Sequence, residues 1–207
     1  MVEIMVEDSS EYLASNLEFE GRCDHLIQAI VVAFKDVHRD DGVTLHEAIV
    51  LDDYGSVAEQ QQARLLDTEQ HWQEVSEQAI FDCCSALSFL DAKGFRFYLP
   101  AFMIVGLRNF YLDRNGIRSS CEFHLTHNRL VPDRSHSLRK FEPESIAELF
   151  KFTPPQITVI AQFLRMVVDF DLGFEGELFV QAVEKWEALA IQCNSHHASI
   201  IPKNSYD

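Results

Sequence analysis

The chain has 207 residues, of which 47% are hydrophobic and 24% are charged, and this composition excludes a disordered chain and a fibrous repeat. The 33 acidic residues outnumber the 17 Lys and Arg residues and give a net charge of −16. Because phosphate groups bind to basic surfaces, this charge argues against binding to nucleic acid or to an anionic membrane. No apolar run reaches the roughly 20 residues that span a bilayer, and no basic segment precedes an apolar stretch near the N-terminus. We therefore expect a cytoplasmic protein.

The length predicts one domain that buries roughly 70% of the surface of the unfolded chain. We expect a flexible acidic lead-in over residues 1–18, a single helical domain over 19–192 and a tail over 193–207. Residues 1–80 hold 18 acids and only 4 bases. These acids either attract the more basic remainder of the fold or offer an acidic face to a basic partner. The five cysteines form no C-x-x-C motif, which predicts reduced thiols.

Helical spacing and capping residues define most of the expected elements. Ser or Thr followed three residues later by Glu or Gln predicts capping boxes that begin helices at Thr44, Ser56 and Thr153. Pro143 suits the first position of a further short helix. Apolar residues at helical spacing predict the main helices near residues 22–38, 77–86, 99–111, 154–170 and 176–191.

The densest apolar stretch is LSFLDAKGFRFYLPAFMIVGL, residues 87–107. We interpret Asp91 as an N-cap, with Phe95, Tyr98 and Leu99 on one helical face and Pro100 as a kink or restart. The alternative is a β-hairpin of residues 87–90 and 95–98 around the Asp-Ala-Lys-Gly turn. The expected fold is therefore mainly α, a single-domain orthogonal bundle of several helices, with one short β-hairpin as the alternative.

Residues 113–141 carry few helical signals, and we expect a long loop there with a short strand near residues 121–125. This segment contains Cys121, His124 and His127, three soft ligands spaced three residues apart. A structural zinc site needs a fourth ligand and usually C-x₂₋₄-C or H-x₃₋₅-H spacing. The pattern is incomplete, so we expect no metal at these residues.

Two acidic pairs, Asp40-Asp41 and Asp52-Asp53, are the other candidate ligands. Hard cations require several oxygen ligands at once, but the spacing matches no EF-hand loop, and Asp is also favoured in turns and caps. The Asp52-Asp53-Tyr54-Gly55 turn is therefore interpreted as structural first. We expect Gly55 to adopt positive φ and Tyr54 to pack inward. The functional alternative is a polar site of Asp52, Asp53 and Tyr54, with Arg96 binding an anion.

The order VTLHEAIVLDDYGS, a helix, HW, SALSFLD and GFRFYLPAFM resembles an uncharacterised bacterial family, domain of unknown function 6714. The resemblance runs from about Gly42 to Leu189 and is most specific in LDDYG and FYLPAF. It implies a small soluble helical protein and no established activity, so no catalytic residue is carried over. The signature residues that it marks are Asp52, Asp53, Tyr54, Gly55, Trp72, Phe95, Tyr98 and Pro100.

Two functions from different classes follow from these patterns. The first is a non-enzymatic interaction domain, similar to an inhibitor or immunity protein, which binds a basic protein partner. The second is a metal-assisted hydrolase that uses the carboxylates of Asp40, Asp41, Asp52 and Asp53. The acidic N-terminal half favours the first function, and the sequence contains no G-x-S-x-G, zincin or phosphate-loop motif. We expect no cofactor, and we favour the non-enzymatic interaction domain, with the hydrolase as the alternative.

Overall fold

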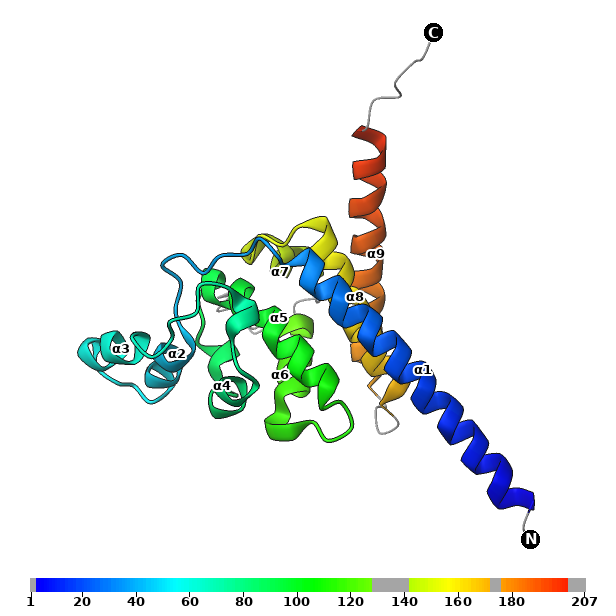
Figure 1. Ribbon diagram of the computed structural model, residues 1–207. Coiled ribbons are helices and arrows are strands. Elements are labelled where there is room, and N and C mark those ends of the chain that lie inside the picture. The colour runs from blue at the N-terminus through cyan, green and yellow to red at the C-terminus, as the bar shows by residue number, and fades with distance from the viewer. Residues whose placement is uncertain (1–2, 128–141, 172–175, 201–207) are drawn as a thin grey trace.

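The computed structural model describes residues 3–127, 142–171 and 176–200, and all of its regular elements in these ranges are helices (Figure 1). The mainly α prediction is confirmed. The α-helices are α1 (Glu3–Ala33), α2 (Leu45–Asp52), α3 (Val57–Arg64), α4 (Glu77–Asp82), α5 (Ala92–Arg108), α6 (Ile117–Thr126), α7 (Pro143–Leu149), α8 (Pro154–Phe170) and α9 (Glu177–Ile200). Three short 3₁₀ helices are η1 (Trp72–Glu74), η2 (Ala86–Ser88) and η3 (Arg114–Gly116).

Helix α5 is the centre of the core, because 13 of its residues, from Gly94 to Leu107, are buried. The Asp91 side chain accepts a hydrogen bond from the Gly94 N–H at 2.8 Å, which confirms the predicted N-cap. The hairpin alternative is wrong, since residues 95–98 lie inside this helix. Pro100 is buried within α5, which continues to Arg108 as one helix.

Helices α1, α4 and α6 pack against α5, and α8 packs against α1 and α9. Two buried tryptophans tie distant segments together through their indole N–H groups. Trp72 donates to the carbonyl of Phe34 at 2.9 Å, and Trp186 donates to the carbonyl of Leu125 at 2.7 Å. Phe95 stacks on Phe150 with ring centroids 4.0 Å apart.

The ends of the chain are more helical than expected. Helix α1 already begins at Glu3, where we expected a lead-in, and α9 continues to Ile200, where we expected a tail. The division into a lead-in, one domain and a tail stays a prediction. Within the ranges that the structure describes, no helix is both long and apolar enough to cross a membrane.

Helix α6 replaces the loop and short strand that we expected near residues 117–126; residues 128–141 lie outside the described residues. The Asp113 carboxylate accepts the backbone N–H of Arg118 at 2.8 Å and so satisfies the start of this helix.

Arg118 is buried over the ring of Phe110 and forms ion pairs with Glu122 at 3.2 Å and Asp171 at 2.8 Å. Burial raises the pKa of Glu122 to about 7.

His124, on the same helix, is buried between aromatic rings. Its ring centroid lies 6.0 Å from that of Phe95 and 5.3 Å from that of Phe123, and its Nε2 lies 3.2 Å from the Ser88 hydroxyl. Burial lowers the pKa of His124 to about 4, because the charged imidazolium is poorly solvated there.

We expect Leu99→Ala to lower the free energy of unfolding by about 2–5 kcal/mol, because it removes a fully buried side chain from the core. The matched control is Leu112→Ala, the same chemical change at a side chain that is 81% exposed, which should cost about 0.5 kcal/mol or less. Denaturant titrations of the two variants measure both values. Equal losses would show that α5 is not the core.

We expect His124 to destabilise the protein at acid pH. Because the folded pKa lies below the unfolded value, the unfolded state binds the proton first, and stability falls as the pH drops below about 6.5. Between pH 8 and about pH 5, the unfolding free energy of the parent should fall by about 2 kcal/mol more than that of His124→Gln. Glu122 titrates in both proteins and cancels in the comparison. The control His127→Gln, at an exposed histidine, should retain most of the parent's acid-side loss, because burial is the larger cause of the lowered pKa of His124 and the charge of His127 the smaller. Parallel curves for the parent and His124→Gln would contradict the prediction.

Candidate functional site

Helices α2 and α3 form a two-helix unit at one end of the molecule (Figure 1). Both predicted capping boxes are confirmed. The Glu47 carboxylate accepts the Thr44 N–H at 3.2 Å, and the Glu59 carboxylate accepts the Ser56 N–H at 2.7 Å. Each box satisfies backbone donors that the first turn leaves free, so the start of each helix is fixed, and the start of α3 at Ser56 borders the connecting turn.

The turn between α2 and α3 closes with Tyr54 in the left-handed backbone region. Its N–H donates to the Leu51 carbonyl at 3.2 Å, and the Gly55 N–H donates to the Val50 carbonyl at 2.8 Å. This pair of bonds is a Schellman motif, in which the residue after the C-cap adopts positive φ and is usually Gly. Tyr54 occupies that position with φ of 57°.

The expectation for Gly55 and Tyr54 is therefore wrong on both counts. Gly55 does not have positive φ; it is required because a Cβ atom there would lie 2.4 Å from Cγ1 of Val50 and 3.1 Å from its carbonyl oxygen. Tyr54 does not pack inward, and 97% of its surface is exposed. A left-handed conformation costs an L-residue about 1–2 kcal/mol, and no packing of the Tyr54 ring offsets this cost.

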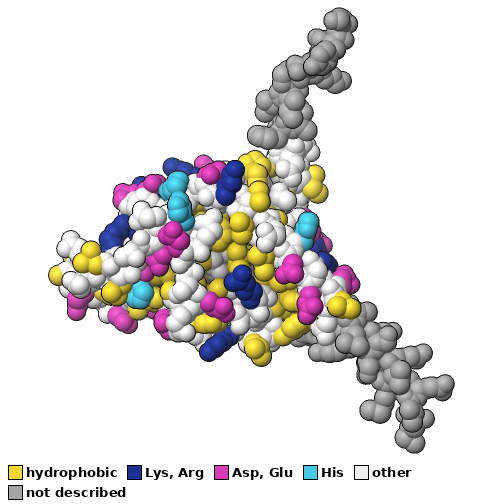
Figure 2. Space-filling view, viewed as in Figure 1, with side chains coloured by type: hydrophobic (Ala, Val, Ile, Leu, Met, Phe, Trp, Pro, Cys, Tyr) yellow, Lys and Arg dark blue, Asp and Glu magenta, His cyan; other side chains and the backbone are white. Residues whose placement is uncertain are grey.

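Other exposed groups surround the turn. Val57, beside the turn, is 67% exposed, and the carboxylates of Asp53 and Glu59 are exposed as well. At the other end of α3, Leu65 and Leu66 are 68% and 63% exposed. Figure 2 shows apolar and acidic side chains intermixed at this end of the molecule. The α2–α3 unit thus presents apolar surface within an acidic surround.

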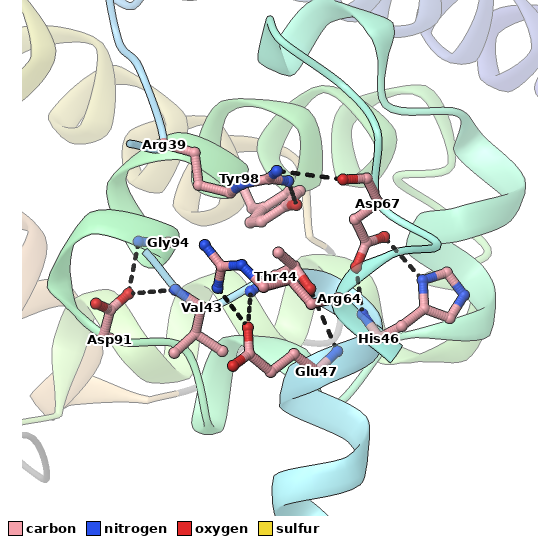
Figure 3. A network of polar contacts seen from close by, with 10 residues as sticks. All are labelled: Arg39, Val43, Thr44, His46, Glu47, Arg64, Asp67, Asp91, Gly94 and Tyr98. Atoms are coloured by element: carbon pink, nitrogen blue, oxygen red, sulfur yellow. Dashed lines mark hydrogen bonds and ion pairs between the residues drawn. The ribbon is translucent and has the colours of Figure 1, made fainter. Parts of the chain in front are cut away.

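A polar network that is buried at Asp67 and Tyr98 and partly exposed elsewhere holds the α2–α3 unit against α5 (Figure 3). The Asp67 carboxylate, 1% exposed, accepts the backbone N–H of His46 at 2.9 Å and contacts His46 Nδ1 at 2.8 Å. Arg39 donates to the Tyr98 hydroxyl at 2.7 Å and to the Asp67 carbonyl at 3.2 Å. Arg64 adds an ion pair with Glu47 at 2.7 Å.

Close backbone contact at the start of α5 completes this attachment. One oxygen of the Asp91 carboxylate accepts the N–H groups of Gly94 and of Val43, the latter at 3.0 Å. A Cβ atom at Gly94 would lie 2.3 Å from the Val43 carbonyl, and one at Gly42 would lie 2.7 Å from the Gly94 nitrogen. The chain before α2 can therefore lie on α5 only where both residues are Gly.

The network is suited to holding structure rather than to catalysis. Burial raises the pKa of the Tyr98 hydroxyl, although Arg39 lowers it in part. Burial and the charge of Asp67 raise the pKa of the Cys83 thiol to about 12. Both groups are therefore neutral near pH 7, whereas a thiol nucleophile needs a lowered pKa.

The structure does not assemble the predicted polar site. Asp52 accepts a hydrogen bond from Ser85 at 3.0 Å, and Asp53 is exposed at the C-cap of α2. Arg96 instead donates to the carbonyl of Lys151 at 3.4 Å. The acidic pairs also have separate surroundings, since Asp41 pairs with Lys93 and Asp40 is exposed.

Cys121, His124 and His127 share a helix but not an environment. Cys121 is fully buried, His124 contacts Ser88, and His127 is exposed at the end of α6. Throughout the described ranges, no three His, Cys, Asp or Glu side chains are grouped so that they could hold a metal ion.

Sequence reasoning marked Tyr54 but placed it in the core. The sequence shows a turn at Tyr54 and Gly55, but no local pattern shows which of the two residues adopts positive φ. The sequence therefore does not show that Tyr54 is exposed. Trp72, Phe95, Tyr98 and Pro100, the other large signature residues, are buried, so Tyr54 differs from all of them.

Comparisons with known proteins agree with the sequence resemblance. The model of a family of unknown function, DUF6714, matches residues 22–189, which include the α2–α3 unit, the network and all of α5. Neither the search of curated proteins nor that of solved structures gave a match. Since the match covers most of the chain, the protein belongs to the DUF6714 family.

Proposed function

We propose that this protein is a non-enzymatic protein-interaction domain that binds a basic protein through the α2–α3 turn. The observation that carries the proposal is Tyr54, which adopts an unfavourable backbone conformation and lies 97% exposed. Strained residues that the surrounding structure holds in place cluster at functional sites. Tyr is also among the residues that contribute most to binding energy in protein interfaces.

The electrostatic surroundings of the turn support a basic partner. Asp53 precedes Tyr54, and Glu59 lies one helical turn into α3, where hydrogen bonds from Ser56 lower its pKa and keep it charged. The one Lys or Arg of the unit, Arg64, is neutralised by Glu47. Acidic groups around an apolar centre would speed the association of a basic partner.

Rigid presentation also supports the proposal. The buried Asp67 carboxylate and the Arg39 guanidinium attach the α2–α3 unit to α5, so the turn is held in one orientation. An interface that is already ordered loses less conformational entropy on binding. The metal-assisted hydrolase is not advanced, because no observation favours it over the interaction domain.

We expect Tyr54→Gly to raise the free energy of unfolding by about 1 kcal/mol, because Gly removes the left-handed penalty and the exposed ring loses no packing. Gly55→Val should lower it by more than about 1 kcal/mol, because the added side chain meets Val50. Thermal and denaturant unfolding of both variants measure these changes. A loss of stability in Tyr54→Gly would show that the Tyr54 ring makes contacts.

The binding test uses the same substitution, because a variant that is more stable cannot lose binding by unfolding. The immobilised protein would capture partners from cells that produce it, and a purified captured protein would be titrated against both forms. We expect a basic protein whose affinity falls at least about 30-fold with Tyr54→Gly and also falls with added salt. Leu112→Ala controls for loss of an exposed apolar side chain elsewhere. Equal affinity for the parent and Tyr54→Gly would overturn the proposal.

A further inference from the structure

A groove runs along α1 over α8, and α9 walls one part of it, contributing four residues to one cavity and only Asn194 to the other. It consists of two neighbouring cavities of about 770 and 1040 Å³, which share His25, Thr158, Gln162 and Asn194 as lining residues. Small residues on each of the three helices, such as Ala29, Ala161 and Ala190, leave this space open. The exposed side chains of Val32 and Ile191 lie on its two walls. The groove is therefore long, apolar and open to solvent, which is the form that receives a helix.

The charge of the groove is opposite to that of the protein. Its lining contains the four bases Arg22, Lys35, Arg96 and Arg165 but only the two acids Asp36 and Glu187, whereas acids outnumber bases almost two to one in the whole chain. Arg22 and Arg165 have close carboxylate partners at 2.6 Å. The groove thus favours an acidic occupant.

Two of these bases, at the end of the groove near the end of α1, are weakly paired. Lys35 is two-thirds exposed and lies 3.8 Å from the exposed Asp36. Arg96 reaches a backbone carbonyl at 3.4 Å, and its buried Nε has no hydrogen-bond partner. Both cations can accept a further carboxylate without breaking a close ion pair.

The first half of α1 has the matching chemistry. Residues 3–18 contain the five acids Glu3, Glu7, Asp8, Glu11 and Glu18 and no Lys or Arg. Positions 3, 7, 11 and 18 follow helical spacing, and positions 22, 25, 29 and 32, which line the groove, continue the same face. Figure 1 shows this end of α1 extending beyond the other helices. The first half of α1 is therefore acidic by sequence, and the second half lines a net basic groove.

We propose that two copies of the protein associate through antiparallel α1 helices, with residues 3–18 of each copy lying in the α1–α8–α9 groove of the other. The two segments are similar in length, because residues 3–18 comprise 16 positions, or about 24 Å of helix, and the helical part of the groove wall, from Gly21 to Ala33, comprises 13, or about 20 Å, with Lys35 and Asp36 in the turn that follows. A two-fold axis near residue 19 places residues 3–18 of each copy in the groove of the other copy at the same time. Both grooves are then occupied, and the assembly closes at two copies.

A second copy explains these features better than a foreign segment. An isolated helix of about 16 residues is only marginally stable in water, so the first half of α1 gains stability from a groove that covers it. The twofold pairing also places each acidic segment in a groove whose lining holds more bases than acids, which opposes the overall repulsion between two chains of net charge −16.

The test is a charge exchange between two variants of the full chain. Variant A carries Glu3→Lys and Glu11→Lys, and variant B carries Gln28→Glu and Lys35→Glu at exposed groove positions. Each variant places like charges together in its own dimer. In the mixture, the two introduced lysines of A meet the two introduced glutamates of B, while the second contact retains the parent's charges. A control with Asp53→Lys and Glu148→Lys makes the same charge change as A at exposed positions outside the groove.

Sedimentation velocity from about 1 to about 200 µM would report the mass of each sample, and circular dichroism would verify that each variant folds. We expect a dimer of twice 23.8 kDa for the parent and the control, monomers for A and for B, and a dimer for their mixture. A monomeric parent, dimers of both single variants, or a mixture that stays monomeric would each overturn the proposal. Unchanged binding of the basic partner by monomeric A would show that this association and the proposed function are separate.

Discussion

The fold depends on the burial of α5 on every side. A helix of 17 residues with 13 buried has no face left for solvent, so other helices must surround it. Polar groups at the start of α5 are the exception to its apolar surroundings, and they determine which segment of the chain attaches to this helix. At its start the Asp91 carboxylate and the two close glycines receive the chain that leads to α2, and one turn later the Tyr98 hydroxyl meets Arg39. The position of the α2–α3 turn therefore follows from the core.

Local chemistry was sufficient to predict the elements whose signals lie within one helical turn. The capping boxes at Thr44 and Ser56 and the N-cap at Asp91 depend on residues three positions apart, and each was predicted correctly. Helix α6 was missed because its start is not marked in this way. Its first donors are satisfied by Asp113, which precedes the helix by four residues, and the intervening chain passes through positive φ at Asn115 and Gly116. A strand-like alternation in the sequence then indicated the wrong structure for residues 121–125.

The candidate site shows a second limit of sequence reasoning. Gly next to Tyr in a turn suggests that Gly supplies the left-handed conformation, yet the contact of Gly55 with Val50 decides otherwise. Similarly, the acids near Asp52 suggested a shared site, but Ser85, which binds Asp52, comes from a segment 33 residues away. Both outcomes depend on which side chains meet in three dimensions, and no spacing within the segment encodes this.

The α2–α3 turn and the lining of the groove share no residue, so occupation of the groove leaves the residues of the turn exposed. The α2–α3 turn is at the far end of the fold from the first half of α1 (Figure 1). A dimer formed through α1 would carry two Tyr54 turns, one on each copy. If the basic partner has repeated or paired sites within reach, the second contact becomes intramolecular and the overall affinity exceeds that of one turn. Self-association through the basic groove would in this way strengthen binding by the acidic turn, although the two surfaces share no residue.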